Sequence, residues 1–75
     1  MEELIEYIAK SLVDDPSQVK VSRRVSGSTI ILELRVAPED TGRIIGKRGA
    51  VANAMRTLLR TMPTRRRERV VLKIL

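Results

Sequence analysis

Apolar residues recur at three- and four-residue steps over residues 2–13, which is the spacing of one face of an α-helix. Acidic residues occupy the first turn of this segment, where the helix dipole favours negative charge. The segment is followed by Asp14, Asp15 and Pro16, and the residue before a proline avoids the helical region. The pattern therefore predicts a helix over residues 2–13.

Two later segments, residues 19–25 and 30–36, alternate apolar and polar residues with the two-residue period of a half-buried strand. Ser26, Gly27 and Ser28 lie between them and form a turn signal. We expect these two strands to pair as a hairpin.

Two helices and a strand are predicted in the second half of the chain. A short helix begins near Pro38, because proline suits a first helical turn, and ends at Gly46. A longer helix over residues 50–61 begins after Gly49 and ends before Pro63. Its expected buried stripe consists of Val51, Ala54, Met55, Leu58, Leu59 and Met62. Residues 64–68 are expected to form a basic loop, and residues 70–75 a final strand.

The predicted order is α-β-β-α-α-β, which indicates an α+β fold. Its three strands are short enough for one sheet, with the helices packed on one face of that sheet. Because 75 residues have room for one hydrophobic core, we expect residues 1–75 to form a single domain.

The composition argues against most enzyme classes. The chain has no cysteine and no histidine, which removes thiolate and imidazole metal ligands and the Ser-His-Asp and Cys-His nucleophile pairs. We therefore expect no enzymatic activity, no cofactor, no metal and no small-molecule substrate. No stretch approaches the ~20 apolar residues of a membrane span, and the acidic N-terminus resembles no targeting signal, so we expect a cytoplasmic protein without membrane contact.

Positive charge is concentrated in the second half of the chain. The net charge is +6, from 15 Lys and Arg against 9 Asp and Glu. Residues 1–18 carry a net charge of −4 and residues 42–75 a net charge of +9. Eleven of the cations are arginines, whose planar guanidinium suits phosphate. This distribution favours a polyanionic partner.

The most informative motif is Gly46-Lys47-Arg48-Gly49, here called the 46–49 loop, which follows two isoleucines and precedes a helix. Glycines permit a tight turn and a close approach to a ligand, and the two cations between them are expected to face solvent or phosphate. The amides at the start of the next helix add the positive end of its dipole. The spacing differs from that of a Walker loop and of a dinucleotide fingerprint.

The motif in this order of elements resembles a type II KH domain, and in particular the small bacterial KhpA family of single KH domains. The segments that carry the likeness are residues 36–49 (VAPEDTGRIIGKRG) and residues 54–59 (AMRTLL). The resemblance implies single-stranded RNA binding, with the 46–49 loop as a clamp on about four nucleotides of backbone. It also implies a role as a post-transcriptional regulator or RNA chaperone, and pairing through the long helix as a homodimer or with another KH protein.

Position by position, the resemblance implies a set of RNA-binding residues. They are Arg43, Ile44, Ile45, Gly46, Lys47, Arg48, Gly49, Ala50, Val51 and Ala54. The apolar members are expected to line a base-binding groove, with the edge of the second strand around residues 31–35 as the opposite wall. The sequence leaves open which of Ile44 and Ile45 faces the RNA. It also leaves open whether Arg56 and Arg60 contact RNA. The same holds for residues 65–67, which we expect to be solvated.

Three alternatives remain at this stage. The two glycines can simply form a helix–helix turn without a ligand. Residues 39–45 and 50–61 can also be drawn as a helix-turn-helix DNA reader, although its first helix would be very short and the hairpin would stay unexplained. Finally, the domain can act as a protein-interaction module, either instead of RNA binding or in addition to it.

Overall fold

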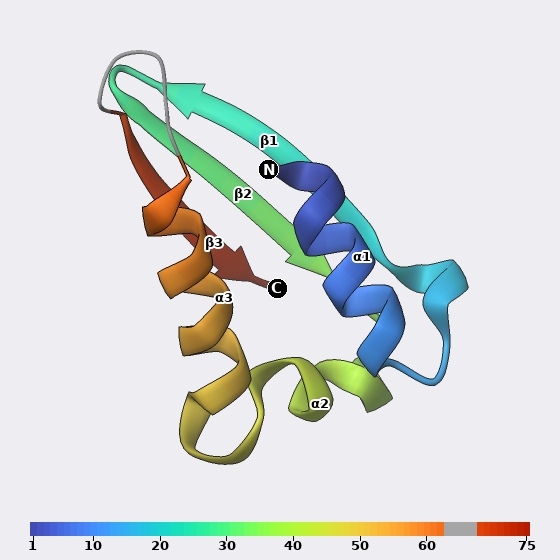
Figure 1. Cartoon of the computed structure of the whole chain (residues 1–75). Coiled ribbons are helices and arrows are strands. Elements are labelled where there is room, and N and C mark those ends of the chain that lie inside the picture. Colours follow the sequence, from blue (N-terminus) through green and yellow to red (C-terminus); the bar gives the residue numbers. More distant parts are fainter. Residues whose placement is uncertain (63–67) are drawn as a thin grey trace.

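The helices and strands of the computed structural model follow the predicted order (Figure 1). The structure describes residues 1–62 and 68–75. The helices are α1 (Glu2–Leu12), α2 (Thr41–Ile45) and α3 (Ala50–Thr61), and the strands are β1 (Lys20–Ser26), β2 (Thr29–Arg35) and β3 (Arg69–Ile74). Single 3₁₀ turns at Pro16–Gln18, Pro38–Asp40 and Lys47–Gly49 were not predicted. The second of these turns explains why α2 begins at Thr41 rather than near Pro38.

The three strands form one mixed sheet in the order β1-β2-β3. β1 and β2 pair antiparallel as the predicted hairpin, with Val21 opposite Leu34, and β2 and β3 pair parallel, with Leu32 opposite Leu72. The central strand β2 is therefore paired along both edges. The expectation that β2 has a free edge is wrong, because β3 pairs along it and lies beside α3. The base-binding groove itself stays a prediction.

The hydrophobic core lies on one face of the sheet, as predicted. Figure 1 shows α1 in front of β1 and α3 in front of β3, so that the described helices do not cover the side of the sheet away from the viewer. The alternation of β2 places Ile30, Leu32 and Leu34 in the core, where they meet Ile5 of α1 and Met55 of α3. Each large side chain buried in this way contributes about 1.5–3 kcal/mol relative to an exposed one.

The predicted buried stripe of α3 is partly wrong. Met55 and Leu59 are buried, but Ala54 is exposed and Leu58 is 45% exposed, while Ala52 is buried instead. The apolar residues of α3 span about 200° of its circumference. The narrow sheet covers only about half of this arc, and the other half faces solvent.

Within the described residues, no helix combines the length and the apolar character needed to cross a membrane.

Candidate nucleic-acid interface

Gly46 ends α2 in a conformation that only glycine adopts readily. Its φ of 77° and ψ of 175° lie in a region that is essentially restricted to glycine. A Cβ at this position would lie 2.6 Å from Val51 Cγ2 and 2.9 Å from the Val51 amide nitrogen. The absence of a side chain therefore lets the end of α2 pack directly against the first turn of α3.

The next three residues form a tight turn that exposes two cations. Gly49 is left-handed, with φ of 75°, and a Cβ there would meet only Asn53 Nδ2, at 3.7 Å. Arg48 also has a left-handed backbone, with φ of 56°, and among the described residues it is the only non-glycine with positive φ. This conformation costs an ordinary residue about 1–2 kcal/mol. Such outliers cluster at ligand sites, and the side chains of Lys47 and Arg48 are both exposed.

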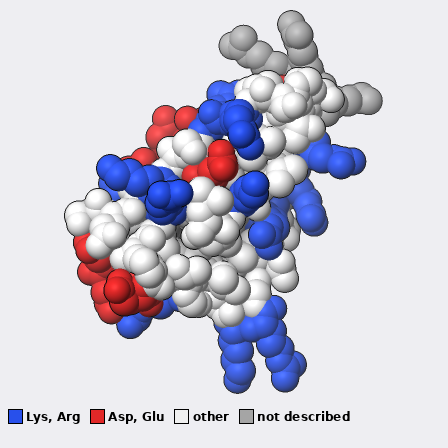
Figure 2. All heavy atoms as spheres, turned by 180° about the vertical axis from the view of Figure 1, so that it is seen from behind, with Lys and Arg blue, Asp and Glu red and all other residues white. Residues whose placement is uncertain are grey.

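The 46–49 loop presents these cations beside the positive end of a helix. Among the described residues, no side chain caps the first turn of α3, so its free amides remain open to an anion. The loop lies at the lower end of the molecule in Figure 1, and basic side chains protrude from the same end in Figure 2. The backbone and the side chains of this loop can therefore bind phosphate together.

The two isoleucines that precede the loop differ in burial. Ile44 is fully buried in the core, whereas Ile45 is 40% exposed. Ile44 therefore supports the loop from the inside, and Ile45 offers an apolar surface beside it.

Arg43 already has two carboxylate partners. Its Nη2 lies 3.0 Å from Asp14 Oδ2, and its Nε lies 3.6 Å from Oδ1 of the buried Asp40. Asp40 also accepts hydrogen bonds from the backbone N–H groups of Asp14 and Asp15, at 3.2 and 3.1 Å. These contacts compensate the charge of Arg43 and tie the start of α2 to the end of α1, so Arg43 is a weaker candidate for phosphate binding than Lys47 or Arg48.

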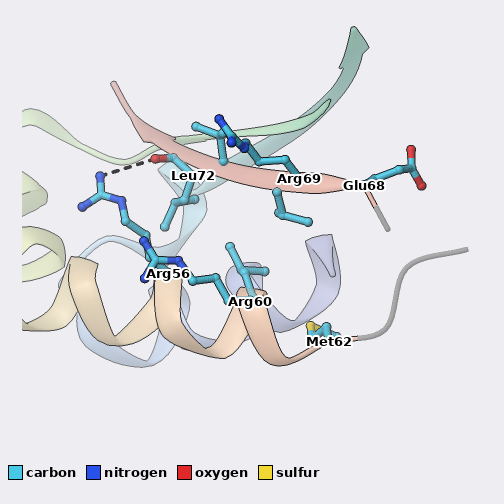
Figure 3. Close-up of a pocket in the computed structure, with 9 residues that line it drawn as sticks. Arg56, Arg60, Met62, Glu68, Arg69 and Leu72 are labelled. Carbon is cyan, nitrogen blue, oxygen red and sulfur yellow. Dashed lines mark hydrogen bonds between the residues drawn. The ribbon is translucent and has the colours of Figure 1, made fainter. Parts of the chain in front are cut away.

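A basic pocket of about 650 Å³ lies between α3 and β3 (Figure 3). Its lining consists of Arg56, Leu59, Arg60, Met62, Glu68, Arg69, Val70, Val71 and Leu72. Arg56 bridges the two elements, because its guanidinium donates to the Leu72 carbonyl, at 3.4 Å, and to Asn53 Oδ1, at 3.4 Å. The lining combines apolar side chains with Arg56 and Arg60 of α3, and it also includes one acid, Glu68.

Sequence reasoning missed the β3 side of this pocket. The signal in the sequence was the recurrence of arginine at residues 56, 60 and 69, but nothing local showed that α3 and β3 lie side by side. Residues 64–67, which belong to the predicted basic loop and include Arg65 to Arg67, lie outside the described residues.

The remaining candidates on α3 do not face this pocket. Ala54 lies about 160° around the helix from Arg56, on the exposed side, and Ala50 shares that side. Val51 packs against Gly46 and the core. The structure thus brings Lys47 and Arg48 together with Ile45 near the loop, and places Ala50 and Ala54 on a separate helix face.

Residues 1–62 and 68–75 contain no group of three or more acidic, cysteine or histidine side chains that could hold a metal ion. The candidate site consists of the 46–49 loop, the start of α3 and the pocket between α3 and β3.

Comparison with known proteins shows which family this chain resembles. Residues 2–74 match the family model described as KhpA/KhpB, KH domain. The chain is 49% identical over 75 residues to the RNA-binding protein KhpA of Clostridium acetobutylicum, with all of both chains covered. It is 47% identical over 75 residues to the same-named protein of Clostridium perfringens, again covering both completely.

A third relative, the RNA-binding protein KhpA of Treponema pallidum, is 47% identical over 74 residues, which cover 99% of this chain and 92% of the relative. No solved structure was found to match the chain. These relatives are named for RNA binding and not for a reaction, which agrees with the prediction of a non-enzyme. The match extends over nearly the whole α-β-β-α-α-β order with its type II KH arrangement, and the chain belongs to the KhpA/KhpB family of KH domains.

Proposed function

We propose that residues 1–75 act as one KH domain that binds single-stranded RNA. The observation that carries this proposal is the 46–49 loop, in which a strained backbone exposes Lys47 and Arg48 beside the uncapped start of α3. The names of the relatives support the choice of RNA over other polyanions.

In this mechanism the loop holds the phosphates and the α3–β3 pocket receives the bases. The KH loop clamps about four nucleotides of backbone. Bases would lie against the partly exposed apolar side chains of Met62 and Val70, while Arg56 and Arg60 supply hydrogen-bond donors.

The binding should be weak and tolerant of sequence. Base stacking on aromatic rings contributes about 1–3 kcal/mol per base in other single-strand binders, and the only aromatic residue here, Tyr7, lies on α1. Contacts of this strength suit a post-transcriptional regulator or RNA chaperone, which acts on many strands without holding them long.

The first test compares the wild type with Lys47→Gln/Arg48→Gln on short single-stranded RNA, with duplex DNA as competitor. We expect the variant to bind at least about tenfold more weakly, because charge-assisted hydrogen bonds contribute about 1.5–3 kcal/mol each. The matched control is Lys10→Gln/Arg23→Gln, which removes the same charge from cations already paired with Glu6 and Glu2. Circular dichroism checks that all three proteins are folded.

Equal RNA affinity of the wild type and the folded loop variant would reduce the 46–49 loop to a helix–helix turn. Preferential binding of duplex DNA would instead favour the helix-turn-helix alternative. The structure gives that alternative little support, because α2 has only five residues and the family model covers the hairpin as well as the helices.

We further propose that the domain pairs with a second copy through the exposed face of α3. This face contains Ala50, Ala54, Thr57, Leu58 and Thr61, and it carries no charge although the chain is strongly basic. Pairing would place two RNA sites on one particle and raise affinity through effective concentration.

Sedimentation of the wild type and Leu58→Glu tests this pairing. We expect a dimer for the wild type and a monomer for the variant, because a carboxylate at the centre of an apolar contact is costly to bury. A monomeric wild type would contradict self-association and leave a heterodimer with another KH protein as the remaining form of pairing.

A further inference from the structure

The face of the sheet opposite the helices is open and strongly basic. Side chains that point to this face alternate with the core residues along each strand. They include five exposed cations and one acid, which are Lys20, Arg24, Arg35, Arg69, Lys73 and Glu33. Figure 2, which views the molecule from behind, shows basic side chains distributed over this face around a small acidic area. We call these six residues the sheet-face cluster.

The strand register brings like charges together on this face. Lys20 lies directly opposite Arg35 in the antiparallel pair of β1 and β2. Like charges at directly opposite positions destabilise a sheet. Folding alone gives no reason for this juxtaposition, whereas binding of an anion compensates both charges.

Among the described residues, carboxylates compensate only part of the positive charge on this face. On the α1 side, Lys10 pairs with Glu6 at 2.7 Å, and Arg23 pairs with Glu2 at 3.9 Å. On the sheet face, Arg24 has a carboxylate within 4.0 Å, namely Glu33 at 3.9 Å. For the other four cations, Lys20, Arg35, Arg69 and Lys73, the part of the chain that the structure describes supplies no such ion pair.

The sheet face is continuous with the α3–β3 pocket across the edge strand β3. Val70 and Leu72 point toward the core side, while Arg69, Val71 and Lys73 point to the sheet face. Arg69 and Val71 also contribute to the lining of the pocket. Figure 3 shows Arg69 on the opposite side of β3 from Arg56 and Arg60. An RNA that leaves the pocket over β3 therefore passes directly onto the basic face of the sheet.

We propose that the open face of the sheet is a second RNA-contact surface, on which the five cations of the sheet-face cluster hold the phosphate backbone of an RNA whose neighbouring segment occupies the α3–β3 pocket. This inference rests on the proposed function of the loop and the pocket, and it extends the footprint of the RNA beyond them. Phosphate contacts position a strand without reading its sequence, so this surface adds affinity for longer RNA and no base preference.

The test uses Arg35→Gln/Lys73→Gln and two lengths of single-stranded RNA. An oligonucleotide of about 4–6 residues fits the loop and pocket alone, and one of ~20 residues also reaches the sheet face. We expect wild-type affinity for the short RNA and an affinity for the long RNA that is about five- to tenfold weaker. The log–log salt dependence for the long RNA should become shallower by roughly 0.7 for each phosphate that the variant no longer neutralises.

Two further variants sharpen the comparison. Lys10→Gln/Arg23→Gln removes the same charge from the α1 side and should leave both affinities unchanged. Glu33→Gln removes the acid from the sheet face and should strengthen binding of the long RNA by about two- to threefold, because it lessens the repulsion of phosphate.

The outcomes separate this inference from the proposed function. If Arg35→Gln/Lys73→Gln binds the long RNA like the wild type, or weakens binding of the short RNA to the same extent as the long one, the sheet face is not a second surface. If Lys47→Gln/Arg48→Gln keeps its affinity for the short RNA, the proposed function of the loop fails, whatever the sheet variant does.

Discussion

The three glycines between residues 42 and 49 are subject to different constraints, and alanine at each position separates them. We expect Gly46→Ala to lower the free energy of unfolding by about 2–3 kcal/mol, because both its dihedral angles and its contact with Val51 exclude a Cβ. Gly49→Ala should cost about 1 kcal/mol, since only its left-handed backbone is at stake. Urea unfolding followed by circular dichroism measures both losses.

Gly42 provides the matched control for this series. It lies within α2, and a Cβ there would meet nothing within 4 Å, so Gly42→Ala should stabilise the protein by about 0.5–1 kcal/mol. Equal losses at residues 46 and 49 would mean that the contact with Val51 relaxes at little cost.

Asp40 is a second residue whose role depends on its neighbours in space. Both of its carboxylate oxygens accept backbone N–H groups of the α1–β1 connection, and it is only 3% exposed. Asp40→Asn places an amide donor against one of these N–H groups, which should cost about 1–3 kcal/mol of stability. Thermal unfolding measures this loss, and the exposed neighbour substitution Glu39→Gln should change stability by less than about 0.5 kcal/mol. An unchanged melting temperature for Asp40→Asn would show that the carboxylate is replaceable.

At the scale of elements, α3 has two neighbouring leucines in opposite environments. Leu59 is 1% exposed and belongs to the core, whereas Leu58 is 45% exposed. Leu59→Ala should destabilise the monomer by about 2–5 kcal/mol, and Leu58→Ala by much less, because only the first substitution leaves a cavity. Urea unfolding at low protein concentration keeps the contribution of pairing out of the comparison. Similar losses from both would contradict the placement of α3.

The same helix shows which structural features the apolar spacing of the sequence predicts and which it does not. Apolar spacing predicted the length of α3 and the burial of Met55 and Leu59, because one helix face must cover the core. It did not predict that Ala54 and Leu58 are exposed, since the width of the covered arc depends on the sheet beneath the helix. Local pattern shows that a face is apolar, and only the assembled sheet shows what covers it.

The candidate site was predictable to a similar degree. The glycine spacing of the 46–49 loop is local, so the sequence indicated the turn and its exposed cations. The β3 wall of the pocket and the ion pair between Arg43 and Asp14 join residues that are far apart in the chain. Because the parallel pairing of β3 with β2 is non-local, the sequence did not show that β3 covers the edge of β2 that was expected to be free.

At the scale of the whole molecule, the net charge differs from the charge available to bind phosphate, because carboxylates already pair with some of the cations. The α1 side pairs its cations with Glu2 and Glu6, whereas the 46–49 loop leaves Lys47 and Arg48 without a carboxylate partner among the described residues. Binding of an RNA strand releases counterions in proportion to the number of phosphates that the RNA places beside such unpaired cations. Total charge is therefore a poor guide to affinity for this protein, and the location of each cation decides its contribution.

Salt titration of short RNA binding distinguishes these two kinds of charge. With three or four phosphates neutralised, the wild type should show a slope of log K against log salt of roughly −2 to −3, at about −0.7 per phosphate. Lys47→Gln/Arg48→Gln should flatten the slope by roughly 1.4 by the same rule. Lys10→Gln/Arg23→Gln lowers the net charge equally and should leave the slope unchanged, because its cations are already paired. If both variants flattened the slope alike, RNA would respond to the overall charge of the domain and the loop would have no special role in binding.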